Sequence, residues 1–405
     1  MALMRLVRNI STRRLVALCA AVVGLLAGAT AFAIAATGGG PKPPPEALPV
    51  AVHDALTAPQ PEGVTARIQF TNHMLSSSDL QGGSPLLSGA SGRLWASSDG
   101  HVRLELQADA SAESGGTSDT QVISDGKQVT VYDSGSNTVY RAALPAADAK
   151  DSGAAATEQP PSVEQIKNAI ARLMDHATVG AAVPSNVAGQ PAYTVRIGPK
   201  QDGGLVGGAE LAWDAVHGAP LRVAIYAKGD SSPVLELKVT DISYGPVSPS
   251  AFDVNPPAGA KVTDLSPSSG GQGDHGDTAP VTGLGNVQQQ VSFPVAAPST
   301  LAGMPQSEVR LIQSGKDAGA LVTYGSGPGG IAVLEQAANP NASTTPSGGD
   351  HSQLTLPSVS INGVQGEELD TPLGTMVRFQ RDGIQYTVLG SVPPATAQAA
   401  ARALP

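Results

Sequence analysis

One stretch of the sequence has the spacing of a nucleotide-binding loop. Residues 325–330 read Gly-Ser-Gly-Pro-Gly-Gly and match the pattern G-x-G-x-x-G after a strand-like run. A dinucleotide site needs a helix that begins at this loop, so that its N-terminus faces the pyrophosphate. Here Pro328 interrupts the loop, and residues 331–335 have the pattern of a returning strand. The stretch therefore predicts a glycine-rich hairpin rather than a cofactor site.

The other reactive side chains lack the spacing of a catalytic or metal site. Asp274, His275 and Asp277 lie close together, but in a flexible polar stretch that offers a metal no rigid frame. The other histidines are scattered without H-E-x-x-H spacing, and no G-x-S-x-G motif is present. The single cysteine, Cys19, excludes a disulfide or a thiolate metal site within the chain. We therefore expect no enzyme activity, no metal and no cofactor.

The composition excludes further classes of protein. Of the 405 residues, 41% are hydrophobic, 3% aromatic and 14% charged, with 47 glycines and 33 prolines. This apolar content argues against a fully disordered chain, and the glycine and proline favour short elements joined by turns. The net charge of −10 disfavours nucleic acid as a partner, since phosphate neutralisation needs clustered Lys and Arg. The length suits two domains.

The first 36 residues have the pattern of a membrane or targeting segment. Four arginines precede residue 15, and residues 15–36 contain no charge. As a helix this run would reach about 33 Å, enough to cross a bilayer core, and the arginines place the N-terminus in the cytoplasm. The length of the run favours an uncleaved anchor, whereas a signal peptide cleaved after Ala33 is the alternative. Because these residues carry no acid, the extracytoplasmic remainder has a net charge of −14.

Most of the remaining chain alternates apolar and polar residues with a period of two. Residues 37–45 are rich in Gly and Pro and predict a tether, and a short helix is expected within residues 46–58. From Val64 to Val239 the alternation then predicts antiparallel strands with one apolar and one wet face. One helix interrupts them: Ser162 and Gln165 form a capping box ahead of an apolar stripe that ends at Met174. We expect this helix to lie across the apolar face of the sheet.

The second half of the chain divides into a linker and a smaller unit. Residues 265–290 are mostly polar and glycine-rich at their centre, which predicts a linker between domains. Strand-like runs follow between residues 309 and 389, with a hairpin signal at Arg381-Asp382-Gly383 and an alanine-rich terminal helix. The predicted organisation is therefore residues 1–36 as a signal-anchor or signal segment, 37–45 as a tether, 46–264 as a first domain, 265–290 as a linker, and 291–405 as a small C-terminal domain.

The strand–helix–strand order of the first domain resembles the LolA/RseB-like superfamily, and in particular its actinobacterial members. The features that carry the resemblance include residues 122–133 (Val-Ile-Ser-Asp-Gly-Lys-Gln-Val-Thr-Val-Tyr-Asp), 208–213 (Gly-Ala-Glu-Leu-Ala-Trp) and 252–257 (Phe-Asp-Val-Asn-Pro-Pro). This superfamily includes periplasmic lipoprotein carriers and lipid-sensing regulators of envelope stress. The resemblance implies a mainly antiparallel β fold with a few helices, an unclosed half-barrel whose apolar concave face the helices cover, and a small α+β C-terminal domain.

The resemblance also implies a function in the cell envelope. It favours a membrane-tethered, extracytoplasmic protein that binds the acyl chains of a lipid or lipoprotein in an apolar groove. The alternative is a regulatory protein of envelope stress that acts on an anti-sigma factor or another membrane partner. A groove can bind acyl chains without any polar motif, because each buried methylene contributes about 0.8 kcal/mol. The candidate groove residues are the inward positions of the predicted strands: Ile68, Phe70, Leu104, Leu106, Val131, Leu211, Trp213, Val223 and Ile225.

Overall fold

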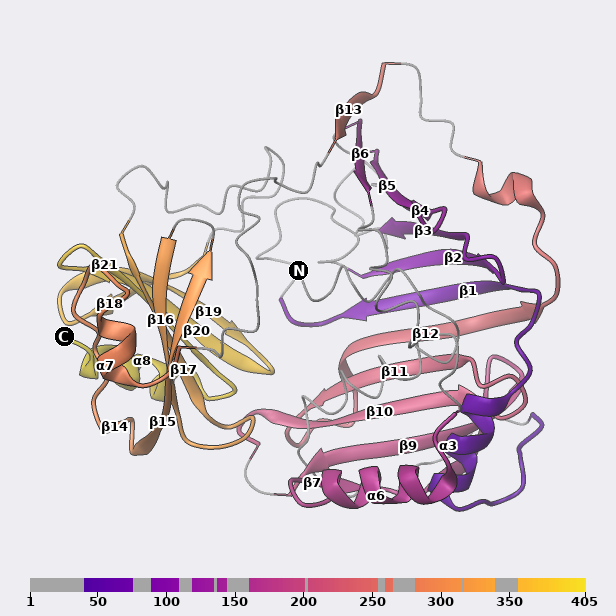
Figure 1. The fold of residues 1–405 in the computed structure, drawn as a ribbon, viewed down its shortest axis with the longest axis horizontal. Coiled ribbons are helices and arrows are strands. Elements are labelled where there is room, and N and C mark those ends of the chain that lie inside the picture. Colours follow the sequence, from indigo (N-terminus) through magenta and orange to yellow (C-terminus); the bar gives the residue numbers. More distant parts are fainter. Residues whose placement is uncertain are drawn as a thin grey trace.

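The computed structural model describes residues 40–75, 89–108, 119–134, 137–143, 160–200, 203–253, 259–264, 281–314, 317–338 and 356–405. These residues form two sheets, one of 13 strands and one of eight (Figure 1). The protein is mostly antiparallel β, as the sequence predicts. The predicted membrane segment and the Asp274–Asp277 stretch lie outside the described residues. No helix within the described ranges is long and apolar enough to span a bilayer.

The large sheet is curled but not closed. Its strand order is β13-β6-β5-β4-β3-β2-β1-β12-β11-β10-β9-β7, with β8 paired to β9, so the two end strands β13 and β7 do not meet. All its pairs are antiparallel except β13 with β6. Its strands are β1 (Gly63–Asn72), β2 (Ala90–Ser97), β3 (Val102–Ala108), β4 (Asp119–Ser124), β5 (Gln128–Asp133), β6 (Thr138–Ala143), β7 (Ala177–Val179), β8 (Val183–Val187), β9 (Gln190–Pro199), β10 (Val206–Asp214), β11 (Pro220–Ala227), β12 (Pro233–Tyr244) and β13 (Lys261–Asp264).

Two of the described helices, α3 and α6, lie at one end of this sheet. α3 (Leu48–Thr57) packs Ala51 and Ala55 against β9 and β10. α6 (Val163–Leu173) begins at the predicted capping box, where the Ser162 hydroxyl accepts from the Gln165 backbone N–H at 3.3 Å. Contrary to the expectation from sequence, α6 does not cross the middle of the sheet. It contacts α3 and the end strand β7 (Figure 1), and Ile166 is the one residue of this helix that is buried.

The small sheet has the order β14-β15-β16-β17-β21-β20-β19-β18. Its core includes Val322, Val333, Val377 and Val388, all fully buried. The predicted glycine-rich hairpin joins β16 to β17, and the hairpin at residues 381–383 joins β20 to β21. Its elements are α7 (Leu284–Gln288), β14 (Thr300–Leu301), β15 (Met304–Ser314), β16 (Asp317–Tyr324), β17 (Ile331–Ala337), β18 (Ser358–Ile361), β19 (Val364–Thr371), β20 (Gly374–Arg381), β21 (Ile384–Gly390) and α8 (Pro394–Ala403).

The two sheets meet where the loop between β9 and β10 contacts the end of β21. The backbone N–H of Leu205 donates to the Ser391 carbonyl at 2.9 Å, and the Ser391 hydroxyl accepts from the Leu205 and Val206 N–H groups. Gly204 has a φ of +67°, and a Cβ there would overlap the Ser391 carbonyl oxygen. Only glycine permits this approach.

Candidate functional site

One face of the large sheet carries a continuous row of apolar side chains, which we call the apolar face. In successive neighbouring strands, the residues opposite one another are Val195, Leu211, Val223, Leu237, Phe70 and Ala90. A second row on the same face runs from Leu94 through Leu104 and Val122 to Val131. Strand alternation keeps both rows on one side because side chains two residues apart point the same way.

All nine candidate groove residues of the sequence analysis lie on the apolar face. Five of them belong to the two rows, and the other four lie two residues from a row member along the same strand. Ile68, Leu106, Leu211 and Trp213 are buried, whereas the other five are half-buried. Trp213 is only 2% exposed and packs on Tyr193, with ring centroids 6.0 Å apart, so it belongs to the core beneath α3. Whether these residues bind a ligand stays a prediction.

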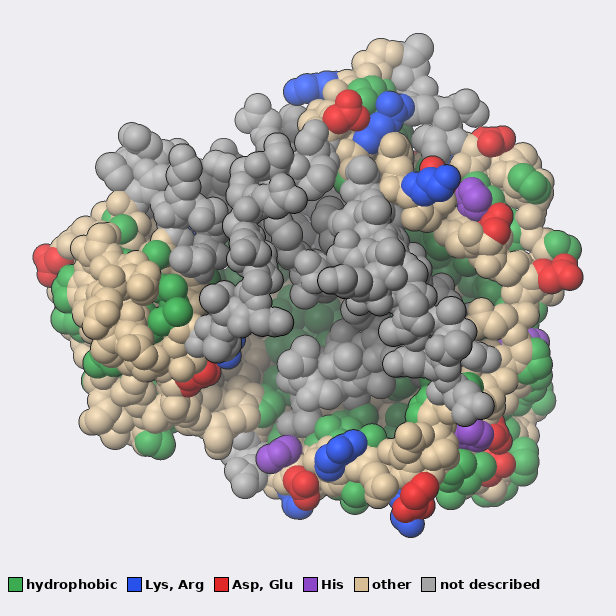
Figure 2. Space-filling view, in the orientation of Figure 1, with side chains coloured by type: hydrophobic (Ala, Val, Ile, Leu, Met, Phe, Trp, Pro, Cys, Tyr) green, Lys and Arg blue, Asp and Glu red, His purple; other side chains and the backbone are tan. Residues whose placement is uncertain are grey.

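Within the described part of the chain, α3 and α6 leave the middle of the apolar face uncovered. α3 and α6 cover the β9–β10 end, and beyond them Leu237 on β12 is 46% exposed. Its neighbours Val223 and Phe70 in the same row are half-buried. Figure 2 shows hydrophobic side chains on the floor of a hollow on this side of the molecule. An exposed large apolar side chain within an apolar row is typical of a surface that binds an apolar partner.

Four further large apolar residues of this surface are not among the candidates predicted from the sequence. These residues are Leu94, Val122, Leu235 and Leu237. They alternate along their strands as the candidates do, but only the order of the strands in the sheet shows that they lie beside the candidates. Leu235 and Leu237 belong to an alternating run that is visible in the sequence. The sequence does not show that these two leucines lie next to β1, which precedes them in the chain by more than 160 residues.

A buried carboxylate fixes the end of the apolar face beneath α3. Asp214, which is fully buried, accepts hydrogen bonds from the Tyr244 hydroxyl at 2.7 Å and from the Val216 and His217 backbone N–H groups. Burial, together with this hydrogen bond to a carboxylate, raises the pKa of Tyr244. The loop that Asp214 holds brings Gly218 against α3, where a Cβ would overlap the Ala55 carbonyl oxygen. This arrangement places α3 on the sheet.

The described part of the predicted tether is bound to the same end of the sheet. The Asn186 side-chain amide donates to the Pro41 carbonyl at 2.9 Å, and the Tyr193 hydroxyl donates to the Pro44 carbonyl at 2.8 Å. Burial and the nearby carboxylate of Glu46 raise the pKa of Tyr193. Residues 40–45 therefore run along β8 and β9 rather than standing clear of the fold.

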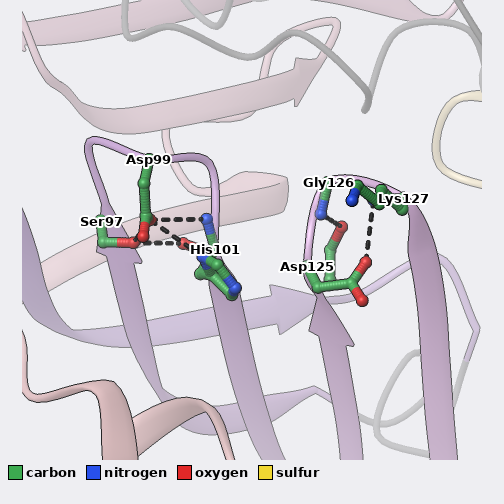
Figure 3. A network of polar contacts seen from close by, with 7 residues as sticks. Ser97, Asp99, His101, Asp125, Gly126 and Lys127 are labelled. Carbon is green, nitrogen blue, oxygen red and sulfur yellow. Dashed lines mark hydrogen bonds and ion pairs between the residues drawn. The ribbon is translucent and has the colours of Figure 1, made fainter.

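A serine, an aspartate and a histidine come together at the turn between β2 and β3, beside the turn between β4 and β5 that contains Asp125 (Figure 3). Asp99 is the centre of this group: it accepts from the Ser97 hydroxyl and lies 2.9 Å from Nδ1 of His101. These hydrogen bonds, that of Ser97 first, lower the pKa of Asp99 to about 2. In a catalytic triad the histidine lies between the serine and the acid. Here the acid lies between them, so the group stabilises a turn and has no activated serine.

A carboxyl group lies in the core of the small sheet. Glu335 is fully buried, and one of its carboxyl oxygens accepts from the Ala296 backbone N–H at 2.9 Å. The other oxygen has no hydrogen-bond partner among the described residues. Burial raises the pKa of Glu335 to about 7, and burial and this carboxyl group raise that of Tyr324 to about 12. Within the described part of the chain, no group of three or more His, Cys, Asp or Glu residues could hold a metal ion.

Comparison with known proteins gives distant structural neighbours. No family model matches the chain, and no curated protein matches it. A solved structure of MucB in complex with MucA(peri) is 17% identical, covering 88% of this chain and 96% of MucB, with a TM-score of 0.39. An uncharacterised conserved protein from Thermus thermophilus covers 53% of this chain and 95% of its own at 13% identity, with a TM-score of 0.30. A putative outer membrane lipoprotein-sorting protein domain from Vibrio parahaemolyticus is 10% identical, covers 51% of this chain and 96% of its own, and has a TM-score of 0.18.

Proposed function

We propose that this protein is a membrane-tethered, extracytoplasmic protein of the cell envelope that binds the acyl chain of a lipid or lipoprotein on its apolar face. The observation that carries the proposal is the open middle of that face, where Leu237 is 46% exposed between two half-buried apolar neighbours. An acyl chain bound along this row of residues would remove both its own methylene groups and the exposed surface of Leu237 from water. Eight buried methylenes contribute about 6 kcal/mol without any polar contact.

The N-terminal segment supports a site close to a membrane. If residues 15–36 cross the bilayer, four residues separate Ala36 from Pro41, which is hydrogen-bonded to Asn186. The five Cα–Cα steps from Ala36 to Pro41 span at most about 18 Å when the chain is fully extended. The β8–β9 end of the sheet, with α3 packed on it, would then lie close to the extracytoplasmic surface of the membrane that residues 15–36 cross. This position suits a protein that receives or senses lipid at the membrane surface rather than one that diffuses between membranes.

Analysis of co-purified lipid tests the proposal. The chain from Gly40 to Pro405, which contains every described residue, is directed to the extracytoplasmic space, purified without detergent and weighed by native mass spectrometry before and after organic extraction. We expect an additional mass that organic solvent removes and that is identified as an acyl lipid. In the Leu237→Glu variant, which places a charge on the open floor, this mass should be lost while the melting temperature changes little. A lipid-free protein that binds no fluorescent acyl probe would exclude the proposed function.

A further inference from the structure

The opposite face of the large sheet carries a groove that the proposed function does not use. It has a volume of about 540 Å³ and lies over β1 to β4, with Thr240 of β12 at one side. The side chains that alternate onto this face at the groove are all polar, in contrast to the apolar face behind them. One row across the four strands consists of Arg67, Arg93, Glu105 and Gln121. We call this surface the polar groove.

Two arginines stand directly opposite each other in the polar groove. Arg67 on β1 pairs with Arg93 on β2, and both are exposed. Residues directly opposite in antiparallel strands have Cβ atoms about 5 Å apart, and like charges there are destabilising. Neither guanidinium group has a hydrogen-bond or ion-pair partner among the described residues. An anion between the two guanidinium groups would offset this repulsion and accept hydrogen bonds from the N–H groups of both arginines.

The nearest carboxylates do not neutralise this pair. Glu105 lies opposite Arg93, but its carboxylate is bound by Arg103 at 2.5 Å. The Arg103 guanidinium group is itself held by the Ala251 carbonyl at 2.9 Å and by the Gln121 side chain at 3.2 Å. Asp241 lies opposite Arg67 on β12 without forming an ion pair with it. Two positive charges therefore face the groove together, which matches a phosphate group better than a single carboxylate.

The rest of the polar groove offers hydrogen-bonding groups of both kinds. The neighbouring row contains Gln107 on β3, which is exposed, and Asp119 on β4. Asp119 is half-buried and contributes to the lining of the groove. A carboxylate repels phosphate but accepts hydrogen bonds from hydroxyl groups. Because β2 and β4 are two strand spacings apart, about 10 Å, the two ends of one small ligand can reach both the arginines and Asp119.

We propose that the polar groove binds a phosphorylated sugar or polyol, with its phosphate between Arg67 and Arg93 and its hydroxyl groups at Gln107 and Asp119. The site is independent of acyl-chain binding, because it lies on the opposite face of the sheet. It would allow the protein to bind a soluble or polymer-borne phosphosugar while its apolar face is occupied.

Calorimetric titration of the full chain in a non-ionic detergent and phosphate-free buffer tests this proposal. The probes are glucose 6-phosphate, glycerol 3-phosphate, inorganic phosphate and glucose. We expect glucose 6-phosphate to bind at least tenfold more tightly than inorganic phosphate, and glucose to show no binding. Arg67→Gln and Arg93→Gln should each weaken glucose 6-phosphate binding at least tenfold, since each removes a charge-assisted hydrogen-bonding fork. Gln107→Ala should weaken binding of the sugar phosphate but leave inorganic phosphate unchanged.

Arg310→Gln is the matched control, because this arginine is equally a strand residue at the surface but belongs to the small sheet. The Arg310→Gln variant should bind every probe with the same affinity as the unmodified chain. Circular dichroism of each variant separates lost binding from lost folding. The proposal is overturned if no phosphate probe binds at millimolar concentration, or if the Arg67 and Arg93 variants bind as the control does. Equal affinities for inorganic phosphate and glucose 6-phosphate would overturn the assignment of a sugar.

Discussion

Replacement of Leu237 by alanine should weaken acyl binding by an amount that its exposure sets. Complete burial of a leucine side chain is worth about 1.5–3 kcal/mol. Since 46% of Leu237 is exposed, a bound acyl chain can gain about 0.7–1.4 kcal/mol by covering it. Leu237→Ala should therefore raise the dissociation constant about three- to tenfold. The measurement is a titration of a fluorescent fatty acid with the chain from Gly40 to Pro405.

Leu389 provides a matched control for this prediction. It is also a strand leucine that is 46% exposed, but it lies on β21 of the small sheet. Leu389→Ala removes the same side chain with the same exposure, so the loss of stability should be similar while acyl affinity is unchanged. Trp213→Ala tests a buried residue of the same face. Loss of this side chain should lower the free energy of unfolding by about 3–5 kcal/mol. Equal acyl affinity in the Leu237 and Leu389 variants would refute the assignment of the open floor as the ligand surface.

Three further predictions concern groups that hold the fold. The pKa of Glu335 is raised from 4.5 to about 7 in the folded protein, so the small sheet should lose about 3 kcal/mol of stability as the pH rises from about 4.5 to above 7. Glu335→Gln should abolish this slope in thermal unfolding measured between pH 4 and pH 8, and an unchanged slope would contradict the assignment. Tyr244→Phe removes the hydrogen bond to buried Asp214 and should cost about 1.5–3 kcal/mol in urea unfolding, whereas a neutral effect would show that the bond does not stabilise the fold. Gly204→Val should separate the two sheets at Ser391, which small-angle scattering would detect as a larger radius of gyration; an unchanged radius would show that this contact does not hold them together.

The alternation of residue types was sufficient to predict which side chains share a face. A period of two fixes the side of every strand residue, and for this reason all nine candidate groove residues lie on the apolar face. The capping box at Ser162 likewise predicted the start of α6, because the two reciprocal hydrogen bonds depend only on residues three apart. These features are local, and local spacing is what a sequence displays.

The exposure of the site could not be predicted, because it depends on contacts between distant parts of the chain. β1 pairs with β12, and this pairing places Phe70 beside Leu237. Trp213 and Leu237 belong to the same face, yet α3 covers the first and leaves the second open. The polar groove has the same origin, since Arg67 and Arg93 belong to strands whose register sets them opposite each other. Neither residue is conspicuous in the sequence alone.

Photo-crosslinking in intact cells tests the central claim most directly. A photoreactive amino acid is placed at position 237 of the full chain, and at position 389 as the control, and the crosslinked species are identified by mass spectrometry. Binding of acyl chains on the apolar face predicts a lipid or the lipidated end of a lipoprotein attached at position 237 and none at position 389. Crosslinks at position 237 only to unlipidated protein would contradict acyl binding and favour a regulatory protein partner, and the same products at both positions would show that the apolar face has no specific ligand.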